Sequence, residues 1–218
     1  MPNHIILVAG TKGGCGKTTT ASNLLVAARL AGVEVVGLDL DPQASLGTWA
    51  ADRAKLGREP DVQVTAGLLR EWRKAVATMP GRLTILDLAP GLDGQRDADA
   101  LYELARVARL VLIPALPEGP SVRKLADVGL ELRRAGADVV FVLNKVIAGR
   151  TIVDDARAYL GDRSELAPIE IPMRDSIHRA MDSGLAVVED EDFGGCTQYR
   201  ELWQFVDARL GLTPAEVA

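Results

Sequence analysis

Cysteine and aromatic residues are scarce in this 218-residue chain. It has two cysteines, Cys15 and Cys196, and 4% aromatic residues. Two cysteines so far apart in sequence exclude a disulfide framework and a cysteine-rich metal cluster. The 21 glycines, set against so few aromatic residues, favour an aliphatic core with many tight turns.

The chain also lacks an excess of positive charge and long apolar runs. It carries 25 Lys and Arg against 30 Asp and Glu, a net charge of -5, so no overall basic field draws it to nucleic acid or anionic lipid. Any such contact needs a local or an assembled basic patch. No apolar run approaches the roughly 20 residues that span a bilayer, and no charged-then-apolar leader precedes the first predicted strand. We therefore expect a cytoplasmic protein that does not bind membranes.

Short aliphatic runs alternate with longer amphipathic segments, the pattern of β-α-β units around a mostly parallel sheet. The runs are almost wholly apolar, as in strands covered on both faces, and comprise residues 5–9, 35–40, 83–88, 110–114, 139–144 and 169–171. Helices are expected over residues 17–31, 45–56, 67–78, 98–108, 121–135, 152–160, 175–183 and 199–210. The sequence predicts an α/β fold with a doubly wound, mostly parallel sheet between helices, in three α/β/α layers. We expect a single domain over residues 1–218, without a separate N-terminal DNA-binding domain.

A glycine-rich loop connects the first predicted strand to the first predicted helix. It reads Thr11-Lys12-Gly13-Gly14-Cys15-Gly16-Lys17-Thr18-Thr19. Backbone N–H groups of such a loop wrap phosphate oxygens, and the helix N-terminus adds partial positive charge. In this spacing Lys17 reaches the β- and γ-phosphates and the Thr18 hydroxyl ligates Mg²⁺. Cys15 fills the variable position of the loop, where we expect a small, unreactive side chain.

The loop departs from the ordinary phosphate-loop pattern, because Thr11 replaces a glycine and Lys12 follows it. Lys-Gly-Gly-x-Gly-Lys-Thr-Thr resembles the deviant Walker A motif of the ParA/MinD/Soj class of P-loop ATPases. This resemblance implies ATP as the nucleotide, a homodimer that sandwiches two Mg-ATP, and a Lys12 that reaches the partner's phosphates. The implied nucleotide contacts within the loop are Lys12, Gly13, Gly14, Cys15, Gly16, Lys17, Thr18 and Thr19.

Three aspartates end predicted strands. Asp39 and Asp41 lie in Asp-Leu-Asp-Pro-Gln, and Asp87 precedes Leu-Ala-Pro-Gly. Because ligands bind beyond the carboxyl ends of parallel strands, all three should point toward the crevice of the phosphate loop. Asp87 resembles a Walker B carboxylate that holds Mg²⁺ through water. The resemblance makes Asp41 the residue that orients the attacking water, and Asp39 a support of the metal's water shell. A carboxylate that caps the next helix is the structural alternative for each.

Asn144 and Pro172 are the residues expected at the nucleotide base. Asn144 follows the predicted strand over residues 139–143, where its amide can act as donor and acceptor for an adenine edge, or can close a turn. Pro172 follows the predicted strand over residues 169–171 and corresponds to a family loop that frames the base through backbone groups.

Two arginines, Arg150 and Arg174, resemble positions where ParA-type relatives bind DNA without sequence preference. With a net charge of -5 one subunit should bind DNA weakly. An ATP dimer that presents two copies of each arginine doubles the phosphate contacts, so DNA affinity should depend on the nucleotide and fall with salt.

The combined prediction is a small ParA-type ATPase that positions a cargo, with plasmid or chromosome partition as the first choice. Lys12, Lys17 and Asp41 form its predicted catalytic set, and Thr18, Asp39 and Asp87 its metal set. Hydrolysis is expected to be slow and stimulated by a ParB-like or other adaptor, and the ATP form to associate with the nucleoid.

Other functions remain open at this point. A MinD-like membrane ATPase needs a basic amphipathic C-terminal helix, whereas residues 199–210 carry mixed charges, which favours docking on the core. A protein-cargo ATPase that positions a microcompartment or a chemoreceptor array is a further alternative. A metal-cluster carrier would need a C-x-x-C pair, and a metabolic ligase would need substrate residues that the sequence does not reveal.

Overall fold

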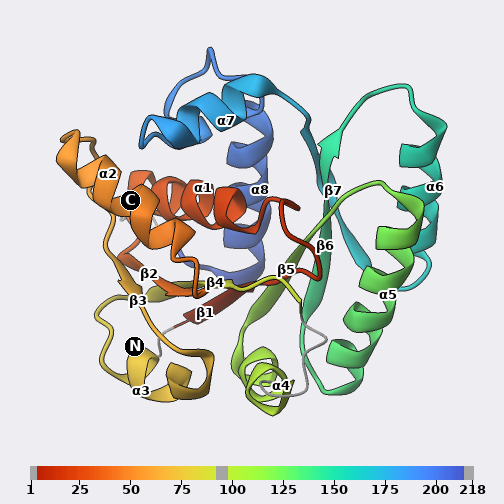
Figure 1. Cartoon of the computed structure of the whole chain (residues 1–218), viewed down its shortest axis with the longest axis horizontal. Helices are drawn as coiled ribbons and strands as arrows, with labels where there is room; N and C mark the ends of the chain where they lie inside the picture. Colours follow the sequence, from red (N-terminus) through yellow and green to blue (C-terminus); the bar gives the residue numbers. More distant parts are fainter. Residues whose placement is uncertain (1–3, 92–97, 214–218) are drawn as a thin grey trace.

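Seven parallel strands form one sheet through the centre of the molecule (Figure 1). The computed structural model describes residues 4–91 and 98–213. The strand order is β3-β2-β4-β1-β5-β6-β7, so the first strand lies in the middle and the order reverses beside it. Such a reversal creates a crevice at the carboxyl ends of the strands. The strands are β1 (His4–Val8), β2 (Val35–Leu40), β3 (Val64–Ala66), β4 (Leu83–Leu88), β5 (Leu110–Ala115), β6 (Val139–Val146) and β7 (Glu165–Pro172).

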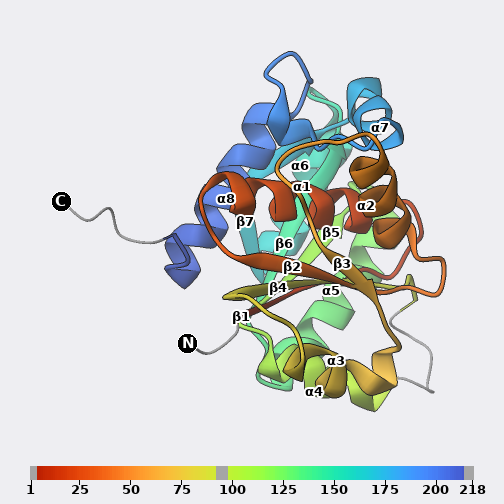
Figure 2. The ribbon, with the colours of Figure 1, turned by 90° about the vertical axis from the view of Figure 1, so that its left-hand side faces the viewer.

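Helices cover both faces of the sheet (Figures 1 and 2). One face packs against α1 (Lys17–Leu30), α2 (Ser45–Lys55), α7 (Asp175–Asp182), the 3-10 helix η2 (Val187–Glu189) and α8 (Cys196–Leu210). The other packs against α3 (Trp72–Ala77), α4 (Ala98–Val107), α5 (Gly119–Arg134) and α6 (Thr151–Gly161). Each face has its own cluster of buried aliphatic side chains, which is why β2, β4 and β5 are buried along their whole length.

The predicted α/β fold and its parallel sheet are confirmed, with differences at several elements. Strand β7 begins at Glu165, four residues before the predicted run, and includes Pro172. The sequence does not predict the short strand β3, because it lies at the sheet edge and two of its three residues are exposed. The helix predicted over residues 67–78 is shorter, since the 3-10 turn η1 (Leu69–Glu71) precedes α3. Only Trp72 of α3 is buried, so little packing holds a longer helix there.

The last helix, α8, docks on the core. Its apolar side chains belong to the same buried cluster as those of α1. Its Arg209 donates two hydrogen bonds each to the carboxylates of Asp138 and Glu165, at the starts of β6 and β7. The apolar face of α8 is therefore occupied by the protein itself. Within residues 4–91 and 98–213, helices are too short or too polar to cross a membrane.

A buried arginine fixes helix α2, which directly follows the Asp39–Asp41 segment. Arg53 is 1% exposed and donates to both carboxylate oxygens of Glu189 at 2.8 Å and to the carbonyl oxygens of Pro60 and Gly184. Trp49 of the same helix donates to the carbonyl oxygen of Leu185 at 3.2 Å. Helix α2 is thereby tied to the connection between α7 and η2.

Candidate nucleotide-binding site

The phosphate loop lies between β1 and α1, at the carboxyl end of the central strand. Gly16 occupies the position before α1 with a φ of 97°, and a Cβ there would lie 2.0 Å from the Asn144 amide nitrogen. Only glycine fits this position. No side chain caps the start of α1, so the first N–H groups of the helix have no internal partner and are available to an anion.

Two lysines of this loop lie in opposite environments. Lys17 is buried, with 6% of its surface exposed, and lines the cleft beside Gly13, Gly14 and Gly16. Lys12 lies on the outer side with 53% of its side chain exposed, and its ammonium contacts a carboxylate oxygen of Glu118 at 2.8 Å. One lysine therefore faces the cleft of its own chain, whereas the other stands at the surface.

Asp87 and Thr18 form the candidate metal site. The Thr18 hydroxyl donates to one Asp87 oxygen at 2.6 Å, and the other oxygen is buried without a partner among the described residues. Burial raises the pKa of Asp87 to about 7, and the nearby Asp39 adds to the rise, while the bond from Thr18 opposes it. A buried carboxylate with a free oxygen beside a hydroxyl fits Mg²⁺ held through water, so the residues present fit the ion.

Asp39 and Asp41 differ in their contacts although they are two residues apart. Asp39 is buried and accepts from the backbone N–H of Asp41 at 3.0 Å and of Gly47 at 2.9 Å, so it caps α2 from the end of β2. This is the structural alternative that its position allowed, and its support of metal-bound water stays a prediction. Asp41 lines the cleft and accepts only from the N–H of Gln43 among the described residues, at 2.9 Å.

The cleft also includes residues outside the predicted catalytic, nucleotide and metal sets. The lining includes Gln43, Ser45, Pro90, Lys145 and His178. His178 carries no motif signal, because it comes from the middle of α7. Lys145 has a φ of 55°, and Ala44 beside the cleft has a φ of 50°, a strained backbone for residues other than glycine. Strain at two points around one cleft is typical of a functional site.

Asn144 and Pro172 meet at a second hollow, next to the first. It is lined by both residues together with Met173, Arg174 and Tyr199, and it shares Gly16, Thr19, Lys145 and His178 with the phosphate cleft. The Asn144 amide, however, is engaged: it donates to the Cys15 carbonyl oxygen at 2.6 Å and accepts from the Lys145 N–H at 2.9 Å. It thus supports the phosphate loop, and its contact with a base stays a prediction.

Cys15 is packed inside the loop. It is 2% exposed, and burial raises the pKa of its thiol. A thiol that is both buried and protonated is unreactive, as expected for a small packing residue at the variable position of the loop.

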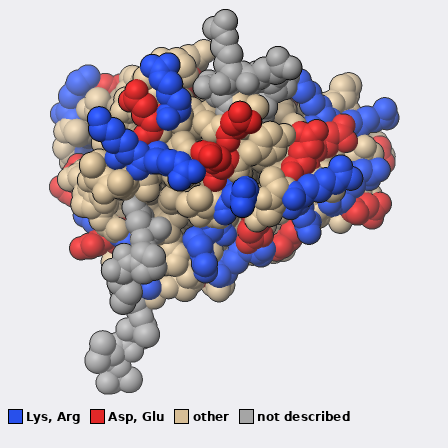
Figure 3. Space-filling view, turned by 90° about the horizontal axis from the view of Figure 1, so that it is seen from below, with Lys and Arg blue, Asp and Glu red and all other residues tan. Residues whose placement is uncertain are grey.

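The two arginines predicted to contact DNA are both exposed and lie on different connections. Arg150 precedes α6 and Arg174 precedes α7. Figure 1 shows that the connections to these two helices diverge from the ends of β6 and β7. Within residues 4–91 and 98–213, neither guanidinium has an ion-pair partner. The face below the sheet carries basic and acidic side chains side by side (Figure 3), including the Arg73–Glu103 pair between α3 and α4.

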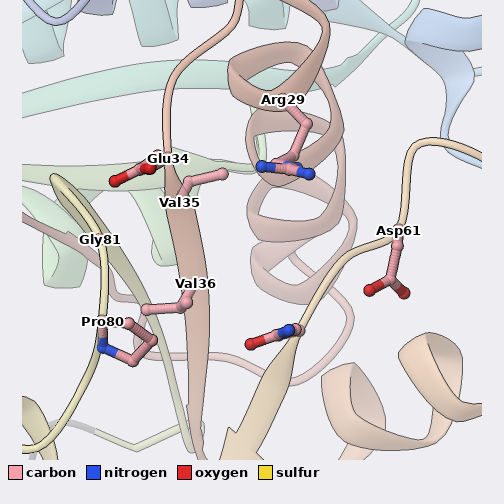
Figure 4. A pocket seen from close by; sticks show the side chains of 8 residues that line it. Arg29, Glu34, Val35, Val36, Asp61, Pro80 and Gly81 are labelled. Atoms are coloured by element: carbon pink, nitrogen blue, oxygen red, sulfur yellow. The ribbon is translucent and has the colours of Figure 1, made fainter.

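A separate hollow lies at the other end of the strands (Figure 4). Its lining includes Arg29, in the last turn of α1, and Glu34, Asp61 and Gly81, which precede β2, β3 and β4. Its volume, about 250 Å³, exceeds the 190 Å³ of the phosphate cleft. It lacks a helix N-terminus or a glycine-rich loop to hold phosphate, so chemistry rather than size identifies the nucleotide site.

Loop, buried lysine, threonine and strand-end aspartate together define a P-loop nucleotide-binding protein. The sequence matches the family described as the CobQ/CobB/MinD/ParA nucleotide binding domain over residues 6–187. The chain belongs to this family.

One relative matches about half of this chain. The maintenance of carboxysome distribution protein A of Gloeobacter kilaueensis is 36% identical over 116 residues, which are 52% of this chain and 50% of that protein. The chain thus matches about half the length of this relative.

Solved structures share the fold. The septum site-determining protein MinD of Pyrococcus horikoshii, complexed with Mg-ADP, has a TM-score of 0.79 at 20% identity, over 99% of this chain and 100% of that one. The McdA–ATP complex from Cyanothece has a TM-score of 0.70 at 16% identity, over 98% of both chains.

Proposed function

We propose that this chain is a ParA-type ATPase that dimerises on ATP, binds DNA without sequence preference and positions a cargo. The observation that carries the proposal is the contrast between the two loop lysines. Lys17 is buried where it can hold the phosphates of its own nucleotide, and Lys12 is exposed where it can contact a second chain.

The cleft residues support hydrolysis with divided roles. Bound ATP and Mg²⁺ supply the phosphoryl group and the charge neutralisation that in-line transfer to water requires. Lys17 and the N-terminus of α1 hold the phosphate oxygens, and Thr18 with Asp87 holds the metal site. Asp41, at the cleft wall, orients the attacking water. An orienting carboxylate without a strong base gives slow turnover, which an adaptor that completes the site accelerates.

The charge of the chain and its two unpaired arginines support nucleotide-dependent DNA binding. A net charge of -5 leaves one subunit with little affinity for DNA. Two subunits joined over ATP double the number of unpaired Arg150 and Arg174 side chains on one particle. Affinity then rises with dimerisation and falls steeply with salt, because each phosphate contact releases counterions. The ATP form associates with the nucleoid and the ADP form leaves it.

The test uses Asp41→Ala, in which hydrolysis is blocked but the phosphate loop is intact. With Mg-ATP we expect a dimer by light scattering and retention on a non-specific DNA duplex, and with ADP a monomer that is not retained. A variant that hydrolyses ATP at the wild-type rate would refute the role of Asp41. A variant that stays monomeric with ATP would refute the sandwich dimer.

The DNA surface needs its own control. In the Asp41→Ala background, Arg150→Glu with Arg174→Glu should lower DNA retention at least ten-fold, because four phosphate contacts per dimer are lost. Arg70→Glu with Arg106→Glu makes the same charge change at two exposed arginines of η1 and α4, on the other side of the sheet. Equal losses of DNA retention with both sets of variants would show that the effect comes from net charge and not from the proposed surface.

A protein cargo is the second candidate, because one relative is named for carboxysome distribution. The two candidates share the ATPase cycle and differ in the adaptor. Imaging a fluorescent fusion distinguishes them: partition predicts that the cargo foci contain a plasmid or a chromosomal site, and organelle positioning predicts foci of a protein assembly.

A further inference from the structure

Glu118 holds the exposed lysine of the phosphate loop. It is the last residue before α5, beyond the carboxyl end of β5, and its carboxylate contacts the Lys12 ammonium at 2.8 Å. Ser121, in the first turn of α5, lies 3.5 Å from the same ammonium. The start of a helix repels a cation, so the Glu118 carboxylate is the group that makes this place favourable for Lys12.

The Lys12–Glu118 ion pair can break so that Lys12 contacts another group. Both side chains are about half exposed, at 53% and 55%, so the contact is weak enough to break. The Lys12 ammonium keeps Glu118 ionised by lowering its pKa, and Lys145 contributes in the same direction. The contact therefore persists at neutral pH.

We infer that Glu118 is a positioning residue that retains Lys12 on its own chain until a second ATP-bound chain offers phosphates in its place. This inference rests on the proposed ATP dimer. Glu118 sets the protein concentration at which dimers form, without touching the bound nucleotide of its own chain. Two such pairs break for each dimer.

The size of the effect is bounded by the weakness of exposed ion pairs. One exposed pair changes an equilibrium by up to about five-fold, so two pairs change the dimer dissociation constant by up to about 30-fold. Screening by salt reduces this difference, because the charges are open to solvent.

The experiment compares Glu118→Gln with its parent in the Asp41→Ala background, with saturating Mg-ATP, by analytical ultracentrifugation. We expect half-association at a 5- to 30-fold lower protein concentration at low salt, and a difference below two-fold in about 1 M salt. ATP affinity measured below the association range should not change. Ser121→Ala should shift association in the same direction by less.

A matched control removes the same charge elsewhere. Glu201→Gln, at an exposed position of α8, should leave half-association unchanged. Equal or weaker association of Glu118→Gln would overturn the inference, and weaker association would show that Glu118 acts within the dimer instead. If the Asp41→Ala parent itself never dimerises with ATP, the proposed function fails. If the parent dimerises and the Glu118→Gln variant dimerises at the same concentration, only the inference about Glu118 fails.

Discussion

The phosphate loop is buried at its helical end and open to solvent at its start. At the helical end, Lys17 is buried, Thr18 bonds to Asp87, and the Cys15 carbonyl accepts from Asn144. At the start, Lys12 has one exposed partner on α5. The difference teaches that one chain can preform the part of the site that we propose to hold its own nucleotide, whereas the part that we propose to face a partner has only an exposed ion pair.

Loss of the buried lysine should have the largest effect on nucleotide binding by one chain. Lys17→Ala removes a charge-assisted contact to phosphate from a buried position, so ATP affinity should fall about 100-fold. Isothermal titration measures this. Lys145→Ala, also at the cleft but half-buried near the end of β6, is the comparison. An equal loss there would show that the buried end of the loop has no special role.

The next effect concerns pH and the metal. With a pKa of about 7, Asp87 is mostly protonated at pH 6 and mostly ionised at pH 8. Because only the ionised carboxylate holds the metal, apparent Mg²⁺ affinity in the presence of nucleotide should fall about ten-fold from pH 8 to pH 6.

The same raised pKa predicts the stability of the nucleotide-free protein. The folded state keeps a proton that the unfolded chain has already lost, so the free energy of unfolding decreases as pH rises toward 7. Relative to Asp87→Asn, the wild type should lose about 1 kcal/mol between pH 6 and pH 8 in urea denaturation without Mg²⁺. Parallel pH curves for the two proteins would contradict the raised pKa.

Asn144→Ala should have a smaller effect on binding. It leaves the Cys15 carbonyl without its buried donor, which corresponds to about a five-fold loss of ATP affinity. If Asn144 only supports the loop, ATP and GTP lose affinity by the same factor. A loss of the preference for ATP would instead show that its amide reads the base.

The smallest effect on monomer binding is expected at the exposed end. Lys12→Ala should change ATP affinity of the single chain by less than two-fold, because Lys12 contacts Glu118 and not its own cleft. The same variant should fail to dimerise and should lose adaptor-stimulated turnover. Normal dimerisation would contradict a lysine that acts across the interface, and a large loss of monomer binding would erase the difference between the two ends of the loop.

Strong local patterns in the sequence predict the fold and the cleft, but they do not predict which distant side chains pair. Apolar runs and the glycine-rich loop predict the sheet, the first helix and a cleft that includes Asp41. Glu118 also lies beyond the carboxyl end of a strand, as Asp41 does, but its contact with Lys12 joins residues 106 positions apart. Arg53 reads as an ordinary charged residue on an amphipathic helix, and its burial depends on the return of residues 184–189 to α2. The engaged Asn144 amide depends in the same way on the close approach of β6 to the loop.

Asp39 holds the backbone at both Asp41 and Gly47 with the two oxygens of one side chain. The backbone between Asp41 and Gly47 is therefore held at both ends by one side chain, which fixes the distance between the ends. Arg53 then anchors α2, the helix that follows. Because both ends of this segment are held, we expect a nucleotide in the cleft to leave the course of its backbone and the position of α2 unchanged.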